Sequence, residues 1–180
     1  MTVYVDVGGD RSYIGQPLYP LLMRLHPSGS YVYFALKGDR FDPADVTTRL
    51  GVAPTRTWRK GDPTPYGNRQ FQYSGWELST AKGTEPLDID RLVTEIVGQL
   101  HDRTGAIVAV KEQFGLESVL EIVLYVDVNE QAFTPALGHD LRTIDFLYHT
   151  RTITDVDIYR YDSSNQDYLG IPPFTPTEDV

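Results

Sequence analysis

The fold is decided by residues 88–103, whose sequence is DIDRLVTEIVGQLHDR. Apolar side chains recur there every three or four positions, which places them in one stripe along an α-helix. The stripe consists of Ile89, Leu92, Val93, Ile96, Val97 and Leu100. Residues 118–128, SVLEIVLYVDV, carry apolar side chains on both alternating faces, as is typical of a strand in the centre of a sheet. Together the two stretches predict helices packed on a sheet.

Further elements are predicted outward from these two. A helix over 43–50 is indicated because Asp42 can cap it and Pro43 suits its first position. A third helix over 135–147 is predicted to begin at Thr134-Pro135. The other predicted strands are 3–7, 31–37, 55–60, 69–79, 106–114 and 152–161. The elements predict an α+β fold: a two-layer sandwich with about three helices on one face of a mixed or antiparallel sheet.

A short motif, Phe-x-Pro-Ala, occurs twice, in residues 41–44 and 133–136. Each copy follows a predicted strand and precedes a predicted helix. Duplicated βαβ units would explain the repeat, since each half could bury its apolar face against the other. Chance is the alternative, because a strand followed by a helix that begins with proline is common.

The predicted elements group into three regions. Residues 1–30 form an N-terminal strand and a proline-rich lead-in, 31–161 a single α+β domain, and 162–180 a C-terminal tail. A length of 180 residues suits one domain.

Composition excludes several kinds of chemistry. The chain has no cysteine, which excludes disulfides, thiolate nucleophiles and cysteine-ligated metal. It shows no signal-peptide pattern and no apolar run long enough to span a bilayer, so we expect a cytoplasmic protein without a membrane partner. Phosphate-binding glycine motifs are also missing, and we expect no cofactor.

A family resemblance rests on three motifs. Leu-Gly-Val-Ala-Pro-Thr spans 50–55, Arg-Lys-Gly-Asp spans 59–62, and Gly-Trp-Glu-Leu-Ser spans 75–79. The pattern, spread over about residues 31–161, resembles a widespread, mostly bacterial family known as domain of unknown function 4279. The resemblance implies a small cytoplasmic α+β domain. It implies no activity, because the family has no assigned catalytic or ligand residues.

Two groups of polar residues could suggest a metal or acid–base site. His139 and His149 lie close to Asp145 in the sequence, but nothing in their spacing requires a metal, so we interpret them as structural or surface histidines. Asp155 and Asp157 share one face of the last strand. We expect them to face water, with the alternate side chains buried.

The sharpest anomaly is the charge of residues 49–82. They hold six basic and two acidic residues, a net charge of +4 in a chain whose total is −9. Aromatic residues are interspersed with the bases, a combination that suits an anionic group. The candidate binding residues are Arg56, Trp58, Arg59, Lys60, Asp62, Arg69 and Trp76. The structural alternative is that Trp58 pairs with Trp76 and the cations pair with the protein's own acids.

Two classes of function remain open. The first is a protein-binding module that uses the hairpin of residues 55–79, with an immunity role against a basic toxin as one form, since acidic and basic surfaces attract. The second is an enzyme acting on a small anionic substrate, with Asp62 as base. We do not expect nucleic acid, because the acidic chain repels phosphates. Neither the catalytic residues nor the oligomeric state follows from the sequence.

Overall fold

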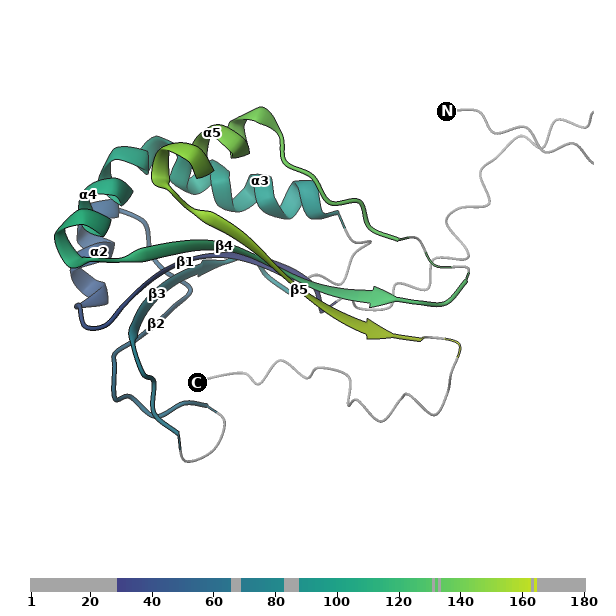
Figure 1. Ribbon diagram of the computed structural model, residues 1–180, viewed down its shortest axis with the longest axis horizontal. Helices are drawn as coiled ribbons and strands as arrows, with labels where there is room; N and C mark the ends of the chain where they lie inside the picture. The colour runs from purple at the N-terminus through teal and green to yellow at the C-terminus, as the bar shows by residue number, and fades with distance from the viewer. Residues whose placement is uncertain are drawn as a thin grey trace, which may run out of the picture.

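Helices and strands alternate along the part of the chain that the structure describes. In the computed structural model this part comprises residues 29–65, 69–82, 88–130, 132, 134–162 and 164. The strands are β1 (Tyr31–Gly38), β2 (Arg56–Trp58), β3 (Ser74–Ser79), β4 (Glu117–Asp127) and β5 (Ile153–Tyr161). The helices are α2 (Pro43–Leu50), α3 (Ile89–Leu100), α4 (Thr104–Phe114) and α5 (Leu141–Thr150). Helices gather on one side of a curved sheet (Figure 1), so the predicted two-layer α+β fold is confirmed.

The five strands form one mixed sheet in the order β2-β3-β1-β4-β5. Neighbouring strands are antiparallel except β4 and β5, which are parallel. β2 and β3 pair as the predicted hairpin, with Arg56 opposite Glu77. β2 and β5 are therefore the two edges of the sheet, and each has one strand neighbour among the described residues.

The core lies between the sheet and the helices. The apolar stripe predicted for α3 is buried along its whole length, and Ile96 is completely inaccessible to solvent. On β1, Val32, Phe34 and Leu36 belong to the same core. Since side chains alternate along a strand, the residues between them lie on the opposite face of the sheet.

Helix ends follow local signals in the sequence. The carboxylates of Asp42, Asp88 and Asp140 each accept a hydrogen bond from a backbone N–H in the first turn of a helix. Gly51 and Gly115 end α2 and α4 in the left-handed region, with φ of 63° and 64°. The predicted bounds of the first helix are confirmed.

The prediction of a strand at 106–114 is wrong, because these residues belong to α4. A run of Ala, Ile and Val there resembles a buried strand. Ile107 and Val110 are three positions apart, however, and both lie on the buried face of the helix. A 3-10 turn at His101–Arg103 leads from α3 directly into α4, which contains Gly105 as its second residue.

The helix predicted to begin at Pro135 begins later, at Leu141. Asp140 caps it, so an acid rather than the proline sets its start. The two halves that share Phe-x-Pro-Ala also differ in topology. β4 and β5 are adjacent parallel strands, whereas β3 lies between β1 and β2.

Some predictions lie outside the described residues. They are the strand at 3–7 with its lead-in, and nearly all of the C-terminal tail. None of the described helices has the length and apolar character that crossing a bilayer requires.

Candidate functional site

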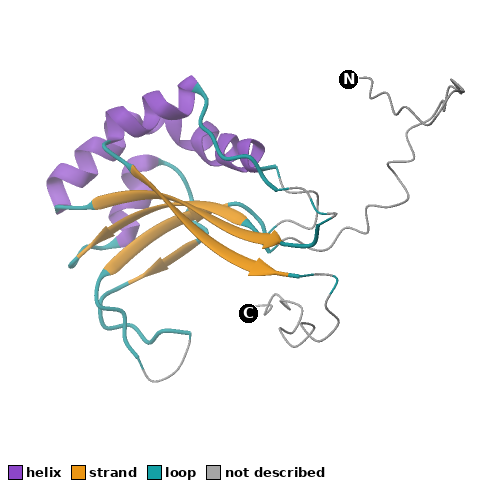
Figure 2. Cartoon of the chain, turned by 45° about the vertical axis from the view of Figure 1, so that its right-hand side comes forward, coloured by secondary structure: helices purple, strands orange, loops and turns teal. Residues whose placement is uncertain are grey.

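The face of the sheet opposite the helices is the candidate site, and we call it the open face. Figure 2 shows the helices gathered along the other side of the curved sheet and at its end. Strand alternation brings residues from all five strands to the open face. They are Tyr31, Tyr33, Lys37, Arg56, Trp58, Glu77, Glu121, Val123, Tyr125, Asp155, Asp157 and Tyr159.

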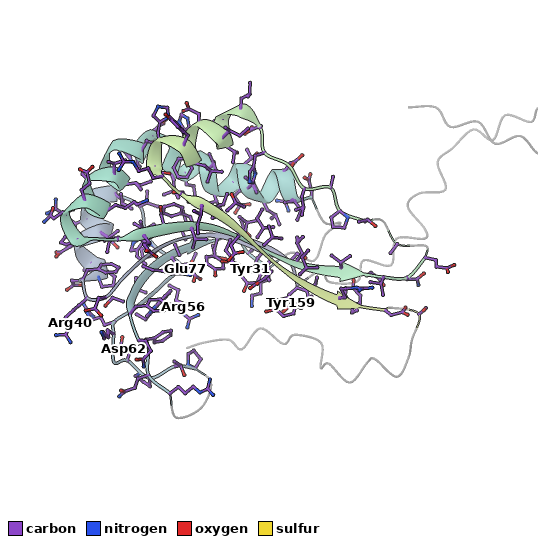
Figure 3. All side chains as sticks on the ribbon, viewed as in Figure 1. Tyr31, Arg40, Arg56, Asp62, Glu77 and Tyr159 are labelled. Atoms are coloured by element: carbon purple, nitrogen blue, oxygen red, sulfur yellow. The ribbon has the colours of Figure 1, made fainter. Side chains whose placement is uncertain are left out.

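Two tyrosine pairs cover the middle of the open face. The rings of Tyr31 and Tyr33 stack with centroids 6.0 Å apart, and those of Tyr125 and Tyr159 stack at 5.0 Å. Figure 3 places Tyr31 and Tyr159 on the side of the sheet away from the helices. Burial, followed by the charge of Glu77, raises the pKa of Tyr31 to about 12, so its hydroxyl remains a neutral hydrogen-bonding group at pH 7.

Acidic residues lie at the β4–β5 end of the open face. Glu121 pairs in register with Tyr33 on β1 and with Asp155 on β5. Only 6% of Glu121 is exposed. Its burial, followed by the charges of Asp155 and Asp157, raises the pKa of this carboxyl above its ordinary value. Burial and Glu121 together also raise the pKa of Tyr33.

Arg56 lies at the opposite end of the open face, on the hairpin. The guanidinium of Arg56 lies over the rings of Trp58 and Phe71, at 5.3 and 5.6 Å from their centroids. Burial raises the pKa of Glu77, while the positive charges of Arg56 and Lys37 oppose that rise. The open face therefore has cations on β2 and β1, with Glu77 between them on β3, and carboxylates on β4 and β5.

Two predicted binding residues, Arg56 and Trp58, are part of the open face. The indole of Trp58 stacks on Phe71 at 5.2 Å and meets Tyr73 edge-on at 6.0 Å. Trp58 is only 7% exposed, and its Nε1 has no hydrogen-bond partner among the described residues. This tryptophan anchors the hairpin to the sheet and leaves the guanidinium of Arg56 on the surface.

Three further candidates are engaged in pairs within the hairpin region. Arg59 binds the Asp42 carboxylate at 2.6 Å, and Lys60 pairs with Asp39. The carboxylate of Asp62 accepts a hydrogen bond from the backbone N–H of Arg59 at 2.7 Å. These groups are exposed, so each ion pair contributes little to stability. Two of the hairpin cations, Arg59 and Lys60, are thus paired with acids of the protein itself.

The last two candidates lie apart from the open face. Arg69 is exposed on the second arm of the hairpin, where its carbonyl accepts a hydrogen bond from the N–H of Thr64. Trp76 is completely buried in the core, and its Nε1 donates to Thr47 Oγ1 at 3.0 Å. Trp58 and Trp76 therefore lie on opposite faces of the sheet and do not pair. Because Trp76 is inaccessible, it cannot offer a surface to a ligand.

Asp155, Asp157 and the histidines form no metal-binding group in the part of the chain that the structure describes. Both aspartates are exposed as expected, but the alternate side chains are less buried than predicted, with Ile158 57% exposed. His149 Nδ1 lies 3.2 Å from Asp145. In the described part of the chain, no group of three or more His, Asp or Glu side chains is arranged to hold a metal ion.

The tyrosines and Glu121 were not predicted as site residues. The available signal was alternation: Tyr31 and Tyr33 alternate with core residues, and Glu121 interrupts an apolar strand. Such signals show that a residue lies on a second face. They do not show whether helices cover that face, which depends on the connections between strands.

Comparisons with known proteins give one match. A family model described as domain of unknown function (DUF4279) matches residues 28–161. No curated protein and no solved structure matches the chain.

Proposed function

The chain belongs to the family described as domain of unknown function (DUF4279), and from its geometry we propose that it is a protein-binding module. The contact surface in this proposal is the open face. One observation carries it: a five-stranded sheet has helices on one face and tyrosines with separated charges on the other. Tyrosine, tryptophan and arginine provide large, rigid contact areas and dominate the binding energy of protein interfaces.

The separated charges indicate the chemistry of the partner. Glu121, Asp155 and Asp157 favour a basic group over β4 and β5, whereas Arg56 favours an acidic group over the hairpin. The net charge of −9 adds a long-range attraction for basic proteins. The proposal therefore has a basic protein as partner, and a toxin neutralised in the bacterial cytoplasm is the specific form that we favour.

Site-specific cross-linking tests the surface. A benzophenone amino acid in place of Tyr31 is expected to capture the partner in cells. The matched control replaces Tyr148, which is 77% exposed on α5 in the helix layer. With the captured protein purified, Tyr31→Ala should weaken its binding about tenfold or more, and Tyr148→Ala should not. Capture from position 148 alone, or unchanged affinity of a folded Tyr31→Ala variant, contradicts the proposal.

An enzyme acting on a small anionic substrate has one observation in its favour. A groove of about 560 Å³ lies beside the start of α2 and is lined in part by Thr47, Arg59 and Asp62. Arg59 is engaged by Asp42, however, and the Asp62 carboxylate by a backbone N–H. A substrate would have to displace both, so we rank this function second. Isothermal titration with inorganic phosphate tests it: saturable binding that Arg59→Ala removes would favour it, and no heat of binding would reject it.

A further inference from the structure

The outer edge of β5 has free backbone groups in the described part of the chain. Among the described residues, β5 is the last strand of the sheet and pairs with β4 alone. The carbonyl of Tyr161 accepts a hydrogen bond from Val128 N, which places it on the β4 side. Because backbone groups alternate in direction along a strand, those of Val156, Ile158 and Arg160 point away from β4.

A side-chain contact agrees with this direction. The Asp155 carboxylate accepts a hydrogen bond from Val156 N at 2.9 Å. That N–H is therefore not used in the ladder with β4. Aspartate on an edge strand is one way in which proteins protect free backbone groups from unwanted strand pairing. The edge beyond it, at Ile158 and Arg160, has no such cover among the described residues.

The side chains along this edge differ between the two faces. Asp155, Asp157 and Tyr159 lie on the open face, whereas Val156 and Ile158 lie on the helix side. Ile158 is 57% exposed, and Tyr159 is 51% exposed. A strand added at this edge would meet acids on one face, and Val156, Ile158 and then Arg160 on the other, because its own side chains also alternate.

We propose that the edge of β5 from Val156 to Arg160 binds an extended segment of a partner protein as a sixth strand, with basic and apolar side chains alternating in that segment. Such β-augmentation takes its affinity from backbone hydrogen bonds and its specificity from alternate side chains. The inference rests on the proposed protein-binding function and shares Asp155 and Asp157 with the open face, but its backbone contacts lie at the outer edge of the sheet.

Charge complementarity favours this occupant over a second copy of the chain. Antiparallel pairing of two β5 edges would bring Asp155 and Asp157 of each copy close to the same residues of the other. Like charges close together across paired strands are destabilising. Lysine or arginine in a partner strand would instead complement both aspartates, and its backbone carbonyl could replace the Asp155 carboxylate at Val156 N.

Peptide binding tests the proposal, with fluorescence anisotropy as the readout. The probe is a labelled peptide of alternating lysine and valine with blocked ends. We expect saturable binding, and binding about tenfold weaker or worse for a peptide of the same composition with its lysines and valines in separate blocks. Equal binding of the two peptides would show that charge alone attracts them and would overturn the proposal, as would no binding.

Backbone methylation sharpens the test on the unmodified protein. N-methyl groups at odd positions of the peptide and at even positions give two probes, and only one of them places the methyls toward β5. The peptide whose methyl groups point toward β5 should bind about tenfold more weakly or worse, because an N-methyl group removes a hydrogen-bond donor. The other methylated peptide should keep its affinity. Equal affinities of the two methylated peptides would overturn the proposed strand pairing.

Two substitutions in β5 test whether the peptide binds at this edge of the sheet. Ile158→Pro removes an outward N–H that β4 does not use, a position that an edge strand tolerates. Both this variant and Asp157→Lys should weaken the binding of the alternating peptide about tenfold or more. Unchanged affinity in folded Ile158→Pro would overturn the proposal. A dimer in sedimentation that Ile158→Pro dissociates would make a second copy the occupant and overturn it too.

The same variants separate the two proposals. Tyr31→Ala should leave the peptide affinity unchanged, because Tyr31 is on β1, two strands from this edge. If the peptide fails to bind but cross-linking from position 31 succeeds, the edge inference is wrong and the protein-binding function stands. If the peptide binds but position 31 captures nothing, the edge inference stands and the open face is not the contact surface.

Discussion

The indole of Trp58 occupies the space that a side chain at Gly75 would need. The two residues face each other across β2 and β3, and a Cβ built on Gly75 would overlap the six-membered ring of the indole. Trp58 is consequently buried although it lies on the open face of an edge strand. Phe71 stacks on the indole, and Arg56 lies over both rings. The absence of a side chain at Gly75 thus leaves room for the indole of Trp58 to pack over β3.

Gly75→Ala should destabilise the protein by roughly 1–3 kcal/mol, the usual cost of forcing an extra group into a packed site. Urea denaturation followed by tryptophan fluorescence measures it. Gly98→Ala is the control, because a Cβ there meets nothing within 4 Å and the residue lies inside α3. It should raise the free energy of unfolding by about 0.5–1 kcal/mol. If both variants change stability equally, the contact between Trp58 and Gly75 is not as described.

Thr47→Val should cost about 1–3 kcal/mol, because it leaves the buried indole N–H of Trp76 without an acceptor. Thr48→Val is a matched control on the same helix. The Thr48 hydroxyl is exposed and donates to the Ala44 carbonyl, so its loss should change stability by less than about 0.5 kcal/mol. The difference in free energy of unfolding between the two variants, measured by chemical denaturation, gives the contribution of one buried hydrogen bond to stability. Equal effects would mean that the bond is not formed.

The sequence predicts elements well where a single local signal dominates. The stripe around Ile96 predicts α3, and Asp42 with Gly51 predicts both ends of α2. Prediction fails where two signals compete. In α4, β-branched residues favour a strand and Gly105 suggests a stop, but packing of Ile107 and Val110 against the core favours the helix. Tertiary packing decides such a case, and the local sequence does not contain it.

The candidate site is less predictable than the fold. Spacing alone shows that Arg56 and Trp58 share a face, but not which face. That depends on the register of β2 against β3, which pairs Trp58 with Gly75 and Thr57 with Trp76. A shift of one residue in the pairing would exchange the faces. The open face also combines Tyr31 with Tyr159, which are 128 positions apart in the chain, and no local pattern joins them.

Glu121→Gln should stabilise the protein at neutral pH. Burial raises the pKa of the Glu121 carboxyl in the folded state, so ionising it costs more in the folded than in the unfolded protein. Neutral Glu121 therefore makes its full contribution to the stability of the wild type below the ordinary pKa of 4.5. This contribution is lost as the pH rises through the pKa of Glu121 in the folded state. The free-energy advantage of the glutamine variant should grow over the same range.

Denaturation curves at about pH 4 and pH 7 measure this difference. Asp157→Asn provides an internal check, because it removes a like charge that raises the pKa of Glu121. In that background the gain from Glu121→Gln at neutral pH should be smaller. A stability difference that is the same at both pH values would show that Glu121 is not buried as described.

Arg56→Ala and Arg69→Ala test whether the hairpin binds a partner or only supports the fold. Arg56 lies over two aromatic rings, so its loss should cost about 1 kcal/mol in denaturation. Arg69 is exposed, and its loss should cost less than about 0.5 kcal/mol. The double variant should remain folded.

If the open face binds the partner, Arg56→Ala weakens the complex captured from position 31, while Arg69→Ala, away from that face, does not. A double variant with full affinity would limit the hairpin to a structural role, and an effect of Arg69 alone would move the contact to the second arm of the hairpin.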